Sequence, residues 1–214
     1  MKEFFYNIYF KFFTLSPLLI SREIKNEWTI LDVGCGRSSI LRLVKKGSYR
    51  VGLDFYEPYI LESEKSSIHD KYVLGDARVL PFKSNHFDCA VANGVLEHLE
   101  KQDGLKMIRE MERVAKKKII LTTPNGFLPA YAGPEDNPEE RHLSGWTIDE
   151  LKKLGFKVRG SCGLKTLWTI RNGQAVLKFK PKILSVLLLG ITELFVYHFP
   201  SLAFELFFVK DLRE

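Results

Sequence analysis

Short apolar runs alternate with longer amphipathic segments along much of this chain. Runs of this length that are rich in β-branched residues predict buried strands, and the segments between them predict helices. The first predicted strand begins at Thr29 and ends in Asp32. The others are Arg50–Asp54, Lys71–Ala77, Phe87–Asn93, Ile119–Thr123, Phe156–Cys162 and Leu202–Lys210. Strands that alternate with helices form βαβ units, so we predict an α/β fold with a mostly parallel, seven-stranded sheet.

Polar side chains recur at the carboxyl ends of four predicted strands. These residues are Asp32, Asp54, Asp76 and Asn93. Each one alone is typical of a turn or a helix cap. Because the carboxyl ends of parallel strands meet at one edge of a sheet, we expect the four side chains to surround a common ligand crevice.

The first strand leads into a glycine loop, Asp32-Val-Gly-Cys-Gly36. Glycine lets a backbone turn sharply and lets a ligand approach it closely. The segment Arg37–Lys46 is predicted to be a helix that ends at Gly47, and its first turn would offer free N–H groups. The acid two positions before Gly34 favours a ligand that carries positive charge.

A dinucleotide site is the main alternative for this loop. The fingerprint of such sites is G-x-G-x-x-G, in which the third glycine allows close packing of helix on strand. Ser39 stands at the third position here, and Asp32 would lie unfavourably close to a pyrophosphate. The sequence therefore disfavours NAD or FAD.

The motifs LDVGCG, VGLD, GDARVLPF, FDCAVANGVLEHL and KKIILTTPNG together resemble the class I S-adenosylmethionine (SAM)-dependent methyltransferases. The likeness is greatest to the methyltransferase type 11 group and to ubiquinone-biosynthesis-type enzymes that act on small molecules. It covers roughly residues 25–160. It implies a Rossmann-like fold with an antiparallel last strand and helices on both faces of the sheet.

The resemblance also implies roles for individual residues. Asp32, Gly34 and Gly36 would hold the methionine part of SAM, and Cys35 between the glycines is included among the cofactor-binding residues. Asp54 would bind the ribose, and Asp76 with Ala77 the adenine. Phe55 would lie against the adenine face, and Asn93 would lie beside the methyl-transfer cleft. Members of the family differ widely in acceptor, so the resemblance does not supply a substrate.

Composition narrows the picture only slightly. The chain has 214 residues and a net charge of +6, which permits an anionic partner without requiring one. Its cysteines, Cys35, Cys89 and Cys162, have neither an even count nor a C-x-x-C spacing, which favours a reducing, cytoplasmic compartment. The five histidines are scattered singly, so no metal site is predicted.

The predicted organisation has four parts: an N-terminal aromatic helix over 1–24, a SAM-binding core over 25–163, an apolar insertion over 164–200 and the last strand over 201–214. Lys11 interrupts the apolar run of the first part, which disfavours a signal peptide. The run Ile183–Phe199 is apolar nearly all round, so a helix there must be buried in something. Burial in the protein core, a homodimer interface and a membrane surface all remain open.

Two histidines are candidates for a general base. His98 follows the fourth strand beside Glu97, and His142 ends a long acidic segment that runs from Pro124 to Trp146. Histidine is the usual base when an acceptor must lose a proton. The long segment is predicted to form a lid over the acceptor. Thr147 followed by Glu150 predicts a capping box at the next helix.

The predicted function is methyl transfer from SAM to a small-molecule or lipid-linked acceptor. An RNA acceptor is a weaker alternative, because only charge suggests it and nucleic acid is not an expected partner. A non-catalytic SAM-binding partner subunit is the alternative from another class. We expect a cytoplasmic protein, with peripheral attachment to the inner face of a membrane left open.

Overall fold

The computed structural model describes residues 16–129, 140–171, 174–178 and 182–212. Seven strands form one sheet in the order β3-β2-β1-β4-β5-β9-β6. Their bounds are β1 Thr29–Val33, β2 Tyr49–Asp54, β3 Lys71–Leu74, β4 Phe87–Asn93, β5 Ala115–Pro124, β6 Lys157–Leu164 and β9 Ala203–Asp211. The strands from β3 to β5 pair in parallel, and β9 pairs antiparallel with both β5 and β6. This confirms the predicted fold class and the antiparallel last strand.

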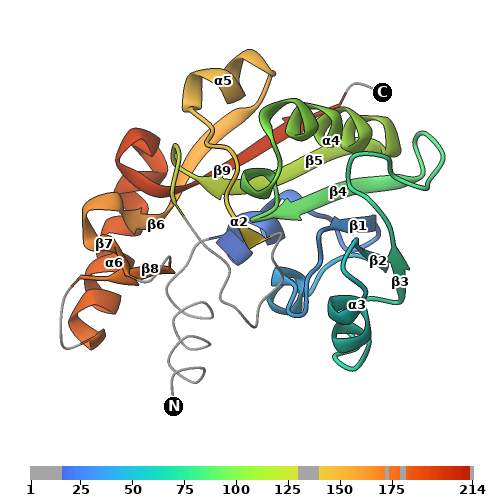
Figure 1. Ribbon diagram of the computed structural model, residues 1–214, viewed down its shortest axis with the longest axis horizontal. Coiled ribbons are helices and arrows are strands. Elements are labelled where there is room, and N and C mark those ends of the chain that lie inside the picture. Colours follow the sequence, from blue (N-terminus) through green and yellow to red (C-terminus); the bar gives the residue numbers. More distant parts are fainter. Residues whose placement is uncertain (1–15, 130–139, 172–173, 179–181, 213–214) are drawn as a thin grey trace.

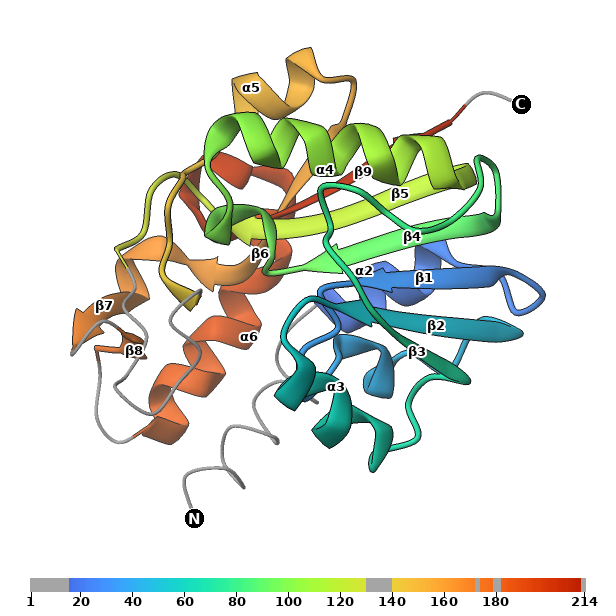
Figure 2. The ribbon, with the colours of Figure 1, turned by 45° about the vertical axis from the view of Figure 1, so that its right-hand side comes forward.

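Helices cover both faces of the sheet (Figures 1 and 2). They are α2 Ser16–Glu23, α3 Glu57–Glu64, α4 Lys101–Val114, α5 Ile148–Lys153 and α6 Lys182–His198. On one face, Met107 and Met111 of α4 pack with Leu151 of α5 over the central strands. On the other face, Leu19 and Ile20 of α2 pack over β1 and β5. The central strands are therefore covered on both sides, as is typical of parallel sheets.

The segment after the glycine loop corrects one prediction. In place of a helix over Arg37–Lys46, the structure has a short 3₁₀ helix, η1, over Ile40–Leu43. The hydroxyl of Ser39 caps it by accepting the N–H of Leu41 at 2.9 Å. The Arg50 guanidinium donates to the main-chain carbonyls of Leu41, Val44 and Lys46. A side chain from β2 thus satisfies carbonyls that an α-helix would otherwise have to pair.

The predicted capping box at the start of α5 is confirmed. The side chain of Thr147 accepts the N–H of Glu150, and the Glu150 carboxylate accepts the N–H of Thr147 at 2.8 Å. Only α2 of the predicted helix over 1–24 falls within the described residues, and the aromatic part before position 16 lies outside them. The boundaries of the four predicted parts remain a prediction.

The apolar insertion between β6 and β9 contains a hairpin and one long helix. The hairpin pairs β7, Trp168–Arg171, with β8, Gln174–Leu177, and was not predicted. Helix α6 packs on β6, where the Cβ of any larger residue at Gly160 would lie 2.2 Å from the Val196 carbonyl oxygen. Leu189, Glu193 and Val196 form the buried side of α6.

The opposite side of α6 is exposed in the single chain, so the protein core covers only one side of the helix, and a membrane or homodimer partner for the other side stays a prediction. Five apolar side chains of this side and one just after the helix are 47–74% exposed: Leu184, Leu187, Ile191, Leu194, Phe195 and Phe199. Within the described residues, no helix has both the length and the apolar character needed to cross a membrane.

Candidate active site

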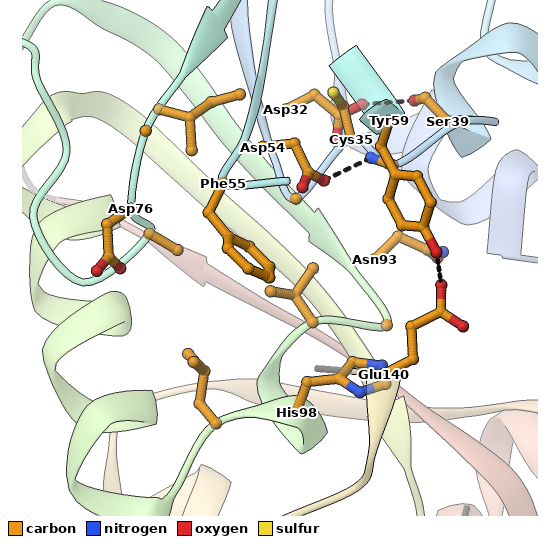
Figure 3. Close-up of a pocket in the computed structure, with 18 of the residues that line it drawn as sticks. Asp32, Cys35, Ser39, Asp54, Phe55, Tyr59, Asp76, Asn93, His98 and Glu140 are labelled. Atoms are coloured by element: carbon orange, nitrogen blue, oxygen red, sulfur yellow. Dashed lines mark hydrogen bonds between the residues drawn. The ribbon is translucent and has the colours of Figure 1, made fainter. Parts of the chain in front are cut away.

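One crevice lies at the carboxyl ends of the central strands, where the strand order reverses between β1 and β4. Ligands of open α/β sheets bind at this type of switch point. The cavity there has a volume of about 530 Å³, within the range of small-molecule sites. All the predicted cofactor-binding residues line it: Asp32, Gly34, Cys35, Gly36, Asp54, Phe55, Asp76, Ala77 and Asn93. Figure 3 shows six of them by name around the space.

The glycine loop wraps over the end of β2. The N–H groups of Gly34 and Cys35 both donate to the Leu53 carbonyl, at 2.7 and 3.0 Å. Gly34 and Gly36 have φ angles of +70° and +56°, a region that favours glycine. Among the described residues other than its chain neighbours, no atom lies within 4 Å of the point where a Cβ on Gly36 would sit, so the loop leaves room for a ligand against its backbone.

Asp54 ties this loop to the start of α3. One carboxylate oxygen accepts the N–H of Gly36 at 2.8 Å, and the other accepts the N–H of Tyr56 at 3.0 Å (Figure 3). Burial raises the pKa of Asp54, and these N–H donors act in the opposite direction. Each carboxylate oxygen has two lone pairs, so Asp54 retains capacity for ribose hydroxyls.

Asp32 is held from within the protein. Its Oδ2 accepts the Ser39 hydroxyl proton and lies 2.9 Å from Nε2 of His69. His69 is buried, and its other ring nitrogen has no hydrogen-bond partner among the described residues. Asp32 also lines the cavity, but its contacts with Ser39 and His69 show that it supports the glycine loop from within the protein. A role toward the methionine part of a ligand remains a prediction.

Asp76 lies at one end of the cavity (Figure 3), and Phe55 and Ala77 also line it. Phe55 is 53% exposed in the structure, which leaves its ring available for stacking. Asp76 forms a salt bridge with Arg78 at 2.7 Å, and Arg78 also contacts Asp103 at 3.1 Å. Hydrogen bonds from Arg78 lower the pKa of Asp76, so this end of the cavity presents a fixed carboxylate.

Asn93 and His98 mark the other end. The Asn93 side-chain carbonyl accepts the Thr122 hydroxyl at 3.0 Å, which fixes the orientation of the amide. His98 lies in η2, a 3₁₀ helix over Leu96–His98 that follows β4, and it lines the cavity. His142 does not line the cavity, but its ring contacts that of His98 with centroids 4.8 Å apart.

The chemistry of this end depends on three titratable groups. Burial raises the pKa of Glu97 to about 8. Burial lowers the pKa of His98, and burial together with the charge of His98 lowers the pKa of His142. Both imidazoles are therefore neutral at neutral pH, which is the form that accepts a proton.

Sequence reasoning missed a latch at the mouth of the cavity, formed by Arg37, Tyr59 and Glu140. The Tyr59 hydroxyl donates to the Glu140 carboxylate and accepts from Arg37 at 3.3 Å (Figure 3). Arg37 lies 3.9 Å from Glu140. The three side chains come from the glycine loop, α3 and the described end of the long acidic segment. No sequence motif links them, because their contact depends on the return of that segment.

Residues 31–122 match the family model described as a methyltransferase domain. This segment is a methyltransferase domain of the class I SAM-dependent type. The chain is 30% identical over 120 residues to a tRNA (carboxymethyluridine(34)-5-O)-methyltransferase of Arabidopsis thaliana. It is 31% identical over 116 residues to a sterol 24-C-methyltransferase of Gibberella zeae. These matches cover 55% and 50% of this chain and only 27% and 28% of the relatives' lengths.

A solved SAM-dependent methyltransferase from Methanosarcina mazei has the same fold, with a TM-score of 0.59 and 19% identity. The comparison covers 92% of this methyltransferase and 98% of that chain. SAM is the cofactor of the family. The residues present fit it, because the cavity combines a free glycine backbone, a buried Asp54 and an exposed Phe55 ring. The part of SAM that each residue contacts remains a prediction.

Proposed function

We propose that this protein transfers the methyl group of SAM to a small-molecule or lipid-linked acceptor. One observation carries the proposal: the cavity is lined beyond the cofactor motifs by His98 and Leu143, and the described side chains leave space there for an acceptor. A non-catalytic SAM-binding subunit has no need for such a space. When bound, SAM supplies an electrophilic methyl group on a sulfonium.

The chain's own residues would then position the acceptor and handle its proton. The fixed Asn93 amide can hydrogen bond to a polar acceptor atom at the end of β4. An O–H or N–H acceptor must lose a proton as the new bond to carbon forms, while sulfur keeps the electron pair of the broken bond. Neutral His98 lines the cavity, where it can accept that proton. The ring of His142 packs against the ring of His98 but does not line the cavity.

A lipophilic acceptor is supported by the uncovered face of α6. The insertion lies on the side toward which the parallel strands point (Figure 2). The exposed stripe from Leu184 to Phe199 is an apolar surface of the kind that marks interaction sites. Exposed Arg171 and Lys178, on the hairpin and just after it, add positive charge nearby. An amphipathic face of this type binds the surface of anionic membranes.

The acceptor class is tested with isotopically labelled methyl-SAM and separated lipid, metabolite and RNA fractions of a lysate. Label in the lipid or metabolite fraction is the expected result. Label in RNA would replace the proposal with the RNA alternative, which has the Arabidopsis relative in its favour. SAM binding with no label in any fraction would favour the partner subunit. Gly34→Ala is the inactive control, because its Cβ would lie 2.5 Å from Val95.

Membrane attachment is tested by flotation with vesicles that contain anionic phospholipid. The double variant Ile191→Glu, Leu194→Glu should remain in the unbound fraction, because both side chains are at least 70% exposed. Val79→Glu is a matched control, since Val79 is 72% exposed and lies outside α6. Failure of the native protein to float, together with a dimer in sedimentation, would assign the face to a homodimer instead.

A further inference from the structure

Glu97, His98 and His142 come together at the acceptor end of the cavity. One carboxylate oxygen of Glu97 and one ring nitrogen from each histidine all lie within 4.8 Å of one another. The first two residues belong to η2, whereas His142 arrives from the far end of the segment after β5. This convergence is a product of the fold, since the histidines stand more than forty positions apart in the chain.

Hydrogen bonds set the tautomer of both imidazoles. Nδ1 of His98 lies 3.3 Å from the Arg141 carbonyl oxygen, and Nδ1 of His142 lies 2.7 Å from the Leu128 carbonyl oxygen. A carbonyl oxygen only accepts, so Nδ1 carries the proton and Nε2 carries the lone pair in each ring. Histidines that bind metal ions are typically held in this manner by a main-chain carbonyl.

Glu97 is fixed at the centre of the group. Its side chain is buried, and its Oε2 accepts the Thr123 hydroxyl at 3.1 Å. Its main-chain carbonyl accepts the N–H groups of Leu143 and Ser144 at 2.8 and 3.1 Å. Those two bonds hold the chain next to His142 against η2. A buried carboxylate is costly unless a cation or several donors accompany it.

We propose that Glu97, His98 and His142 bind one divalent transition-metal ion, with zinc as the best fit. Two imidazole nitrogens and one carboxylate oxygen are a ligand set that zinc uses at sites with an open position. Ligands bound at about 2.0–2.2 Å from one ion lie closer together than 4.8 Å, so binding would draw the side chains inward by roughly 1 Å.

The effect of the ion on an acceptor rests on the proposed function. Because His98 lines the cavity, the open position of the ion would face the acceptor. With its Nε2 lone pair on the ion, His98 would be a ligand in place of the general base. An acceptor hydroxyl that binds there would lose its proton to solvent more readily, because a bound cation lowers the pKa of a coordinated oxygen. The favoured acceptor is thus an oxygen nucleophile, such as a phenol or enol, rather than a carbon or an amine.

Metal binding is measured first, without SAM or acceptor. Untagged full-length protein is treated with EDTA, dialysed and titrated calorimetrically with zinc, and its cobalt form is examined by visible absorption. We expect one zinc ion per chain and cobalt bands of a four- or five-coordinate site. His142→Ala and Glu97→Gln should each weaken zinc binding at least tenfold. Exposed His86 lies outside the cluster, so His86→Ala should bind as the native protein does.

Absence of stoichiometric zinc binding, or equal affinity in the native protein and both cluster variants, would overturn the proposal. SAM affinity of each variant is measured in parallel, and native affinity shows that the variant is folded. A variant that loses SAM as well is replaced by His98→Gln, which keeps a hydrogen-bonding side chain. Zinc binding with no methyl transfer to any acceptor would leave the metal site standing and would count against the proposed function alone.

Discussion

Asp54 offers the sharpest test of how this methyltransferase binds its cofactor. Its carboxylate already accepts N–H groups from Gly36 and Tyr56, and we expect it to accept ribose hydroxyls as well. Asp54→Ala therefore removes two kinds of interaction, one that shapes the glycine loop and one that contacts the ligand. Measuring the variant with a single ligand cannot separate them.

A cycle that changes both protein and ligand separates the two roles. S-adenosylhomocysteine and its 2′,3′-dideoxy analogue are titrated calorimetrically into the native protein and into Asp54→Ala. A hydrogen bond to a charged acceptor contributes about 1.5–3 kcal/mol, which corresponds to roughly 10- to 150-fold in Kd. We expect a loss of this size for the natural ligand and a much smaller loss for the analogue.

The result that refutes the reasoning is an equal loss of affinity for both ligands. Asp54 would then act only by holding Gly36 and Tyr56 in place. Asp76→Ala is the matched control, because Asp76 lines the cavity where we expect the adenine and not the ribose. Its effect should be the same for the natural ligand and for the dideoxy analogue, whatever its size.

Three further changes test other parts of the structure. Tyr59→Phe removes the hydroxyl that contacts Glu140, so ligand dissociation measured by stopped flow should quicken about two- to tenfold; an unchanged rate would show that the latch does not hold the ligand. Gly160→Ala forces a Cβ against the Val196 carbonyl, so the free energy of unfolding measured in urea should fall by about 1–3 kcal/mol. An unchanged free energy of unfolding would contradict the close packing of α6. Burial raises the pKa of Glu205, so the folded protein binds its proton more tightly than the unfolded chain and stability falls as pH rises above 4.5. Glu205→Gln should flatten that slope in thermal unfolding, and an unaltered slope would exclude this group as its source.

Local signals predicted most of the sheet and the cofactor end of the site. Hydrophobicity predicted a first strand that begins at Thr29 and ends in Asp32, where the structure has Thr29–Val33, and the antiparallel strand at the end of the chain was predicted within a residue. Glycines at positions 34 and 36 marked a sharp loop because their backbone angles are accessible to few other residues. The four polar strand ends all reached one cavity, since parallel strands share a common edge.

Predictions that depended on distant partners were less successful. Arg37–Lys46 has a helical pattern, but Arg50 from the next strand pairs carbonyls in that segment and only η1 forms. The run Ile183–Phe199 predicted a helix correctly, yet periodicity could not indicate that one side of it would stay uncovered. Side-chain contacts from other elements decided both outcomes.

The sequence by itself determined the α/β class, the glycine loop and the set of residues around the cofactor crevice. These features follow from hydrophobic period, backbone freedom and strand direction, all of which act over a few residues. Only the tertiary structure decided that His142 meets Glu97 and His98, and that Glu140 meets Tyr59. Those contacts require residues 140–146 to lie against the ends of the parallel strands, and their position there depends on the packing of the whole domain.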